Sequence, residues 1–543
     1  MAIWRSFTQP ARYATLLAGA VPVLAFPALD LEFVAWIGLV PGLLLLRAAP
    51  SAREAAIRGW WFGSGYLLFA LYWLTPNIGP ALLLVAIVLG VPWAGFGLAA
   101  WWLLRDPGGA QVPETGSGRE PAPDAGQPAP SPGRALSARR LLGPPGPGPG
   151  RALAAVAVLP SAWVVIDWLR SWQGIGGPWA VFGTSQWQHP VVLSLAAVGG
   201  VWLISFVLVA ASTGITVALT SATGAGRALG AVAVALTLAA GPLAWALTSS
   251  EYPSAGPVSL LLVQPGLQAT PWDTVAQEIR LTTHAPRADL VVWGESSVGY
   301  DLYARPAVLT RLRRLSASIG RQLLVSQDAV SPAGAKSKVA VMIGPRGIEE
   351  SYTKSRLVPF GEYIPFRSVL GWLTKVSRAA PQNMIEGNGA HVLHATLPSG
   401  RRLTFGVLIC FESSFPDMSR ADVNHGAEVL IFQTSDSTFQ GSWAPEQHAS
   451  LTALRAAETG RPAVQAALTG DSVAFDARGR QLAWASTTDR GILRVTVTAT
   501  RGSARTPFAR FGDYVPWIAI AVVLIAIASA LNSAGYLRRF RRR

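Results

Sequence analysis

The stretch Thr404–Pro416 reads TFGVLICFESSFP and places the only cysteine of the chain directly after an apolar run. Leu403–Ile409 has the composition of a buried strand, and we expect Cys410 to begin a turn that leads into a helix. A helix N-terminus and a nearby lysine both lower the pKa of a thiol, so Cys410 is a candidate nucleophile for attack on a carbonyl carbon. The alternative is an inert core cysteine, because free cysteines are commonly buried.

Apolar runs and helical stretches alternate on both sides of this strand, over about 255–500. The apolar runs are Val258–Val263, Asp289–Trp293 and Val429–Phe432, and the helical stretches lie near 272–285 and at Pro445–Glu458. Such alternation is typical of a layered α/β domain.

Two further strand ends carry charged side chains in apolar surroundings. Glu295 closes a buried strand beside Gly294, and a buried carboxylate is costly unless it is paired or its pKa rises, as in a general base. Lys354 lies among apolar and proline residues, where an ammonium group can stabilise a developing oxyanion. The alternatives are a loop acid or helix cap for Glu295 and a surface ion pair for Lys354, with Glu362 as its partner or as a second acid.

Glu295, Lys354 and Cys410, in this order at three strand ends, resemble the nitrilase (carbon–nitrogen hydrolase) superfamily. The flanking words match as well: Gly294 before the glutamate, PFGEY at 359–363 after the lysine, and FE and FP at 411–412 and 415–416. The resemblance implies a four-layer α-β-β-α sandwich. It makes Glu295 the general base, Lys354 the stabiliser of the tetrahedral intermediate and Cys410 the nucleophile, with Glu362 and Glu412 as supporting acids.

The composition of the whole chain is that of a membrane protein. Of 543 residues, 50% are hydrophobic and 14% are charged, and the mean hydropathy is +0.34, whereas soluble domains have roughly 25% charged residues. Apolar runs long enough for the roughly 20-residue span of a membrane helix occur near 12–28, 32–48, 57–75, 79–104, 152–169, 191–218, 227–248 and 517–531. We therefore expect about eight spans, although the first run has the alternative of a signal peptide.

The arginine distribution predicts the orientation of these spans. Arg5, Arg12, the second loop, the Arg-rich fourth loop, Arg227 and the basic tail all fall on one side of eight alternating spans, and Lys and Arg are enriched on the cytoplasmic side. The orientation of the spans then explains most of the net charge of +15, and no nucleic-acid partner is needed to account for it. We expect a transmembrane domain at 1–250, an extracytoplasmic catalytic domain at 255–500, and a last span with a cytoplasmic tail at 512–543.

The loop 105–151 is rich in proline and glycine and cannot bury a core. We expect a disordered cytoplasmic linker, with a proline-rich docking site as the alternative. With a single cysteine, the chain forms no intramolecular disulfide and no thiolate zinc cage. We expect no metal and no organic cofactor.

A nitrilase domain between the last two of eight spans resembles the apolipoprotein N-acyltransferase family. The helical half agrees in the words DWLR at 167–170, GPW at 177–179 and GTSQ at 183–186. The resemblance implies a multi-pass enzyme of the bacterial cytoplasmic membrane. Cys410 takes a fatty acyl chain from a phospholipid and passes it to the α-amine of the diacylglyceryl cysteine of an apolipoprotein. The resemblance also makes Trp272 and Phe411 substrate-binding residues, with Phe411 where a tyrosine is often found.

Some features leave alternatives open. The motifs TSDSTF at 434–439 and LTG at 468–470 stand where the family has SNDAWF and NNG. The pocket behind the cysteine therefore departs from the family pattern. The segment 366–379 has helical apolar spacing and is either a lid in the lipid interface or core packing. The competing functions are a membrane-anchored amidase and a transporter, for which Asp167 is the candidate intramembrane charge.

Overall fold

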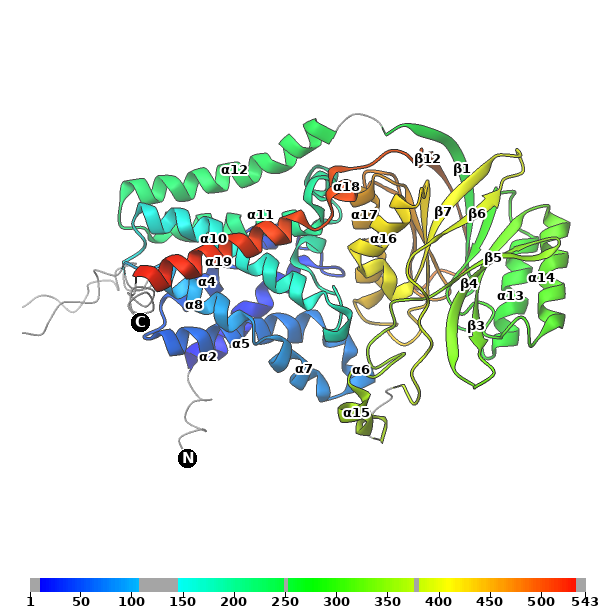
Figure 1. Ribbon diagram of the computed structural model, residues 1–543, viewed down its shortest axis with the longest axis horizontal. Coiled ribbons are helices and arrows are strands. Elements are labelled where there is room, and N and C mark those ends of the chain that lie inside the picture. Colours follow the sequence, from blue (N-terminus) through cyan, green and yellow to red (C-terminus); the bar gives the residue numbers. More distant parts are fainter. Residues whose placement is uncertain (1–9, 107–144, 249–251, 376–379, 534–543) are drawn as a thin grey trace, which may run out of the picture.

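The computed structural model describes residues 10–106, 145–248, 252–375 and 380–533. It contains a helical part, formed by the chain before residue 249 and by the last helix, and a two-sheet part formed by the chain between them (Figure 1). Most of the linker expected at 105–151 lies outside the described residues.

Four described helices are long and apolar enough to cross a membrane: α10 (Pro149–Arg170), α11 (Pro190–Thr220), α12 (Gly224–Thr248) and α19 (Tyr514–Ser533). The pair α7 (Ala81–Leu89) and α8 (Trp93–Leu103), bent by 44°, counts as a fifth if it forms one span. These elements lie in five of the eight predicted runs, and they make the chain a membrane protein.

The other three predicted runs form shorter or more polar helices. They contain α2 (Pro10–Ala20), α3 (Val34–Ile37), α4 (Val40–Arg47) and α5 (Ala52–Ala70). α2 passes into a 3-10 turn at Val21. α5 carries Glu54 in its first turn, where it pairs with Arg12 at 2.6 Å and with Arg58 at 3.2 Å. Eight spans therefore stay a prediction.

The two-sheet part contains two six-stranded sheets. The first has the order β12-β1-β2-β3-β4-β5 and the second β11-β10-β9-β8-β7-β6. The strands of the first sheet are β1 (Ser254–Gln264), β2 (Leu290–Trp293), β3 (Gln322–Val330), β4 (Lys336–Gly344), β5 (Gly347–Thr353) and β12 (Gly491–Thr500). Those of the second are β6 (Val392–Thr396), β7 (Arg402–Ile409), β8 (Val429–Thr434), β9 (Ala463–Ala467), β10 (Ser472–Phe475) and β11 (Gln481–Ala485). In each sheet three strands run parallel, β1-β2-β3 and β7-β8-β9, so their carboxyl ends lie at one edge.

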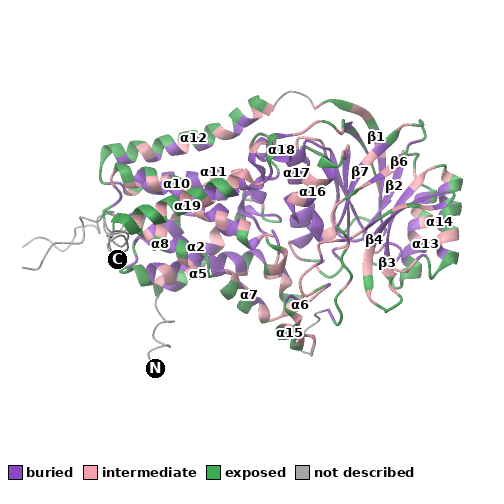
Figure 2. Cartoon of the chain, viewed as in Figure 1, coloured by how far each residue is buried: buried purple, intermediate pink, exposed green. Residues whose placement is uncertain are grey.

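Helices cover both outer faces of the stacked sheets. α13 (Pro271–Thr283) and α14 (Pro306–Ile319) cover the first sheet, and α16 (Pro416–Asn424) and α17 (Ala444–Thr459) cover the second (Figure 1). Figure 2 shows buried residues concentrated in the strands and in α17, and exposed residues on α13 and α14. The predicted α-β-β-α sandwich is confirmed.

The two sheets approach closely at Gly294, just after β2. A Cβ at this position would lie 2.1 Å from the amide nitrogen of Leu468, which follows β9. Real Cβ atoms do not approach other atoms so closely, so a side chain here would push the sheets apart. The neighbouring Glu295 amide donates a hydrogen bond to the Thr434 carbonyl (3.1 Å), which joins the ends of β2 and β8 beside the predicted catalytic glutamate.

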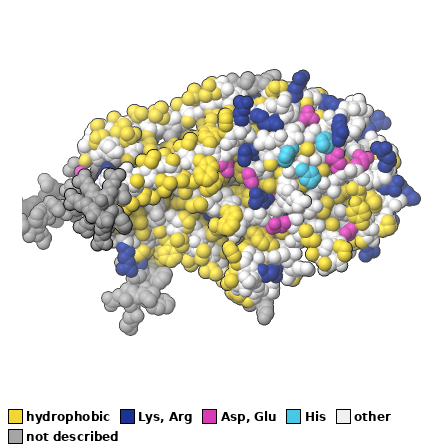
Figure 3. Space-filling model, viewed as in Figure 1, with side chains coloured by type: hydrophobic (Ala, Val, Ile, Leu, Met, Phe, Trp, Pro, Cys, Tyr) yellow, Lys and Arg dark blue, Asp and Glu magenta, His cyan; other side chains and the backbone are white. Residues whose placement is uncertain are grey.

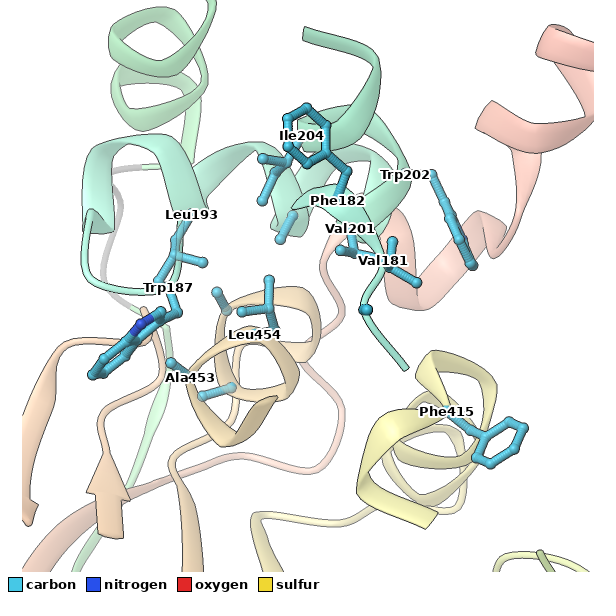
Figure 4. Close-up of a cluster of buried hydrophobic side chains, with 14 of the residues drawn as sticks. Val181, Phe182, Trp187, Leu193, Val201, Trp202, Ile204, Phe415, Ala453 and Leu454 are labelled. Carbon is cyan, nitrogen blue, oxygen red and sulfur yellow. The ribbon is translucent and has the colours of Figure 1, made fainter. Parts of the chain in front are cut away.

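The helical part packs against the helix layer of the second sheet. A cluster of buried apolar side chains includes Phe182 and Ile204 of the helical part and Leu454 of α17 (Figure 4), and each such fully buried side chain contributes roughly 1.5–3 kcal/mol. Figure 3 shows hydrophobic side chains spread over the surface of the helical part and charged ones over the two-sheet part.

A break in α11 supplies a polar contact across the same interface. Gly199 and Gly200 leave helical geometry, with φ of +71° at Gly200, and the freed amide of Val201 donates to Glu458 Oε1 of α17 (2.8 Å). Burial raises the pKa of Glu458 to about 7, although Arg455 opposes the rise.

Candidate active site

Three strand ends position Glu295, Lys354 and Cys410. Glu295 follows β2 after one glycine, while Lys354 and Cys410 follow β5 and β7 directly. Lys354 Nζ lies 3.2 Å from Glu295 Oε1, and the charges of both side chains act on the Cys410 thiol. The structure therefore brings the three predicted residues together, two from the first sheet and one from the second.

Lys354 is buried between two carboxylates. Its Nζ donates to Glu362 Oε1 at 2.8 Å as well as to Glu295. Burial alone would lower the pKa of Lys354, but Glu295 and Glu362 raise it well above its usual value. Lys354 is therefore an ammonium ion, and Glu362 is its partner, as one of the two sequence interpretations had it.

The backbone of Cys410 is strained. Its φ is +52°, a left-handed conformation that costs a residue with a Cβ about 1–3 kcal/mol. The residue stands between the extended end of β7 and a 3-10 turn over Cys410–Ser414. This sharp change of direction keeps the side chain partly accessible at the end of a buried strand.

The Cys410 thiol is harder to ionise than the sequence suggested. Desolvation and the Glu295 carboxylate raise the pKa of the thiol well above its usual value, although Lys354 lowers it. The expectation of a lowered pKa is therefore wrong. It assumed a helix N-terminus at the cysteine, whereas the residue begins a 3-10 turn and α16 starts only at Pro416. A base is needed to generate the thiolate.

Glu412 connects the turn that contains Lys354 (the lysine turn) with the 3-10 turn over Cys410–Ser414 (the nucleophile turn). Its buried carboxylate accepts hydrogen bonds from the Tyr352 hydroxyl (2.6 Å) and from the amides of Ser355 (2.7 Å) and Arg356 (3.0 Å). Its other oxygen accepts from the amide of Ile409 (2.8 Å). The residues on either side of Lys354 and the residue before Cys410 therefore share one carboxylate.

His448 contacts the nucleophile turn, and the sequence analysis missed it. Its Nε2 lies 3.1 Å from the Cys410 carbonyl oxygen and 3.0 Å from Ser413 Oγ, and its Nδ1 lies 3.0 Å from Asp436 Oδ1. Burial lowers the pKa of His448, but the Asp436 carboxylate and the hydrogen bonds of the ring raise it by more than this, so the net pKa lies above the usual value. Because a carbonyl oxygen can only accept, the Nε2–H group of His448 donates this hydrogen bond to the strained residue.

The two predicted substrate-binding aromatics lie in different places. Phe411 is buried beside the nucleophile, with its ring edge-on to Phe415 (5.1 Å between centroids). A Cβ on Gly177 would lie 2.6 Å from the Phe411 ring, so the GPW word of the helical part packs on this turn. Trp272 lies in the first turn of α13, and the Arg311 guanidinium of α14 covers its ring at 4.4 Å. Its contact is with the outer helix layer of the first sheet.

The segment expected as one helix over 366–379 is shorter in the structure. α15 covers Arg367–Leu370 and a 3-10 turn covers Gly371–Lys375, while 376–379 lie outside the described residues. Val369 and Trp372 are 70% and 56% exposed, which argues against core packing.

Within the described part of the chain, no group of three or more His, Cys, Asp or Glu side chains is arranged to hold a metal ion.

Comparisons with known proteins match both parts of the chain. The carbon-nitrogen hydrolase family model matches residues 262–506, and the model of the apolipoprotein N-acyltransferase N-terminal domain matches 18–120 and 131–214. A solved structure of a carbon-nitrogen hydrolase from Helicobacter pylori is 16% identical, covers 44% of this chain and 89% of that chain, and has a TM-score of 0.36.

Two curated relatives align over most of their length. An apolipoprotein N-acyltransferase of Brucella melitensis is 29% identical over 572 residues, which cover 98% of this chain and 96% of the relative. One from Sinorhizobium medicae is 30% identical over 507 residues, 86% of each chain. With both parts of the chain matched, it belongs to the apolipoprotein N-acyltransferase family.

Proposed function

We propose that this chain transfers a fatty acyl chain from a membrane phospholipid to the α-amine of the S-diacylglyceryl cysteine of an apolipoprotein, through a thioester on Cys410. The observation that carries the proposal is the buried Lys354 ammonium between Glu295 and Glu362, which acts on the only cysteine. Its site lies in a domain packed against apolar helices. Membership in the apolipoprotein N-acyltransferase family supports the choice of substrates.

The first half-reaction forms the thioester. Glu295 accepts the thiol proton, and the sulfur attacks the carbonyl carbon of a phospholipid ester. Lys354 stabilises the oxyanion of the tetrahedral intermediate. The carbon–oxygen bond then breaks, the lysophospholipid alkoxide takes the proton from Glu295, and the acyl chain stays on Cys410. The raised pKa of the thiol makes general-base help a requirement of this step.

The second half-reaction transfers the acyl chain to the lipoprotein. The α-amine of the diacylglyceryl cysteine attacks the thioester carbon, and Glu295 accepts a proton from the attacking nitrogen. Lys354 again stabilises the oxyanion, the carbon–sulfur bond breaks, and the thiolate takes up the proton. Donor and acceptor use one site in turn, which is a ping-pong mechanism. The residues of the chain supply every proton transfer in this sequence.

The membrane placement supports lipid substrates. We infer about eight spans, both termini in the cytoplasm, and the catalytic domain of 255–500 on the extracytoplasmic face of the bacterial cytoplasmic membrane. Each methylene moved into water costs about 0.8 kcal/mol, so extraction of a chain of about 15 methylenes would cost about 12 kcal/mol. A catalytic edge that packs on membrane helices avoids most of this cost, because the acyl chain stays among apolar groups.

A membrane-anchored amidase is less well supported. A hydrolase would share the thioester and would resolve it with water. The helical part matches the N-terminal domain of apolipoprotein N-acyltransferases. This favours the transferase, because a simple anchor would not need that domain.

Mass spectrometry of the purified protein tests the proposal. After incubation with a phospholipid of defined acyl chains, we expect a fatty-acyl adduct on Cys410 that a diacylglyceryl-cysteine peptide discharges, with the peptide gaining the acyl group. The Cys410→Ala variant is the control. A protein that forms no adduct, or one whose adduct is discharged by water as fast as by the peptide, would refute the transferase.

A further inference from the structure

A pocket of about 410 Å³ lies where the end of α10 meets the two-sheet part. Its lining comes from the end of α10 and the turn after it, from Trp202 of α11, from Arg356, from 415–417 after the nucleophile turn, and from Asp513 before α19. Glu295, Lys354 and Cys410 are absent from this lining, so the pocket is distinct from the site of the three candidate catalytic residues.

Arg356 supplies a positive charge to this pocket. Its guanidinium donates to Asp417 Oδ2 at 2.9 Å and to Gln173 Oε1 at 3.1 Å, and it lies 5.3 Å from the centre of the Phe415 ring. A guanidinium has five N–H donors in a fork that matches phosphate oxygens, and these two bonds use two of them. The side chain is 32% exposed, so the group is open to an anionic ligand.

Two carboxylates supply the opposite charge. Asp417 pairs with Arg356 and is 42% exposed. Asp513 is held in place by two indoles, with Trp168 Nε1 3.2 Å from Oδ2 and Trp202 Nε1 3.1 Å from Oδ1. A ligand that carries only phosphate would meet two carboxylates, and a simple cation would meet the guanidinium. A group with both charges matches this arrangement.

The rim of the pocket is apolar and lies at the ends of two candidate spans. Trp172, Leu169 and Ile175 are 61%, 49% and 39% exposed. Trp168 packs on Trp517 of α19, with 5.3 Å between ring centroids. Exposed tryptophans at the end of a span mark the level of the lipid headgroups. The charged floor of the pocket therefore lies at the depth where headgroups are found.

We propose that this pocket binds the headgroup of a zwitterionic phospholipid, with its phosphate on Arg356 and its ammonium group on Asp417 and Asp513. Its acyl chains lie outside the pocket along α10 and α19. With its acyl chains directed along α10 and α19, this lipid is separate from the acyl donor. It contacts the segment that follows Lys354 and the segment that follows Cys410, and so joins the two turns of the active site to the membrane.

Photo-crosslinking of the full chain tests the site. The probe is a phosphatidylethanolamine with a diazirine near the top of one acyl chain, bound to the Cys410→Ala variant in detergent micelles. We expect label on peptides that contain 168–175. Unlabelled phosphatidylethanolamine should compete with the probe. Diacylglycerol with the same acyl chains and soluble glycerophosphoethanolamine should not, since the first lacks the headgroup and the second lacks the chains.

Substitutions at Arg356 make the test specific. Arg356→Gln should reduce labelling of 168–175 by at least about tenfold, as expected for loss of a charge-assisted hydrogen bond, while Arg356→Lys should retain part of it. Arg494→Gln, on the exposed face of β12, is the matched control and should label like the parent. Equal labelling of Arg356→Gln and the control would overturn the proposal, as would equal competition by diacylglycerol.

This result is independent of the acyl-transfer test. A chain that labels at 168–175 but forms no adduct on Cys410 would refute the proposed enzymatic function and leave the lipid site standing. A chain that forms the adduct but labels only near Cys410 would do the reverse. The thermal unfolding midpoint of each variant shows that loss of label does not reflect loss of the fold.

Discussion

The two sheets of the catalytic part differ in what they give to the site and in what surrounds them. The first sheet supplies Glu295 and Lys354, and its outer helix α13 buries only four of its 13 residues. The second sheet supplies Cys410, and its outer helix α17 buries 15 of its 16 residues, against the sheet on one side and the helical part on the other. The proposed base and oxyanion stabiliser therefore come from the solvent-facing half of the sandwich, and the proposed nucleophile comes from the half in contact with the helical part.

This division shows how one fold can accept a lipid substrate. The sheet that carries the nucleophile is also the one whose helices touch the membrane part, so an acyl chain need not cross the sandwich to reach the sulfur. Glu295 and Lys354, the proposed base and oxyanion stabiliser, come from the other sheet. Substitutions on the two sides should therefore have different effects, and the predictions below run from the largest expected effect to the smallest.

The largest effect is expected at the nucleophile of the second sheet. Cys410→Ser should abolish the acyl adduct and all transfer, because the hydroxyl of serine has a far higher pKa than the thiol and Glu295 cannot deprotonate it. Intact-protein mass spectrometry after exposure to phospholipid measures this. A serine variant that transfers acyl chains at the parent rate would remove Cys410 from the mechanism.

The base of the first sheet should matter next. Glu295→Gln keeps the shape of the side chain but cannot accept the thiol proton, so acyl-enzyme formation should slow by about 10²–10⁴-fold. Quenched-flow mass spectrometry gives the rate. Substitution of Glu350, on the same sheet but at a distance from the cysteine along β5, by Gln is a matched control. Equal rates in the two variants would exclude Glu295 as the base.

Lys354 should affect stability as well as rate. Lys354→Met leaves Glu295 and Glu362 as two buried carboxylates without their shared cation, and breaking such a pair costs about 3–5 kcal/mol. We expect a clear fall in the thermal unfolding midpoint, and a smaller one in Glu362→Gln, where Lys354 keeps Glu295. An unchanged midpoint in Lys354→Met would show that the carboxylates take up protons at little cost.

His448 tests the contribution of the second sheet to positioning. His448→Gln removes the ring N–H that donates to the Cys410 carbonyl group. Acyl-enzyme formation should then fall about tenfold, as for the loss of one hydrogen bond worth about 1.4 kcal/mol. The folded pKa of His448 lies above its usual value of 6.5. The pair with Asp436 therefore adds stability that is fully present below about pH 6.5 and is lost as the pH rises through the folded pKa. Thermal midpoints measured against pH should show this fall in the parent and not in the variant.

The smallest effect is expected at the exposed segment that follows the Lys354 turn. Val369 and Trp372 are the side chains that a membrane lid would use. Replacing both by serine should raise the KM for phospholipid a few-fold, with acylation by a soluble activated ester unchanged. An unaltered KM for phospholipid would rule out the lid.

The sequence was informative wherever chemistry stands at the end of a strand. Glu295 and Cys410 follow apolar strands and Lys354 lies beside apolar and proline residues, so their places were readable from the sequence. The α-β-β-α sandwich and the supporting acids Glu362 and Glu412 followed from the family resemblance. His448 was not readable, because a lone histidine in a helix gives no signal until the helix is packed against a carbonyl group. The pKa of the thiol was also out of reach, since it depends on desolvation and on the distances among three charges.

The three early spans stay unconfirmed for a different reason. Apolar runs near 12–28 and 32–48 are long enough by composition, but α2 is 11 residues long and is followed by a 3-10 turn, and the second run is divided into α3 and α4. In α5 the charges of Arg53, Glu54 and Arg58 occupy the first two turns. Composition counts apolar residues, whereas helix length depends on where the backbone breaks.

The break in α11 has a consequence for how this chain matures. Val201 has lost its helical acceptor, and the carboxylate that replaces it belongs to α17, more than 250 positions later in the chain. Until that later segment has been synthesised and folded, an amide in the middle of a hydrophobic helix is without its partner. This hydrogen bond of the helical part therefore forms only when the two-sheet part docks on it, so the Val201 amide of α11 is satisfied at a late step of folding.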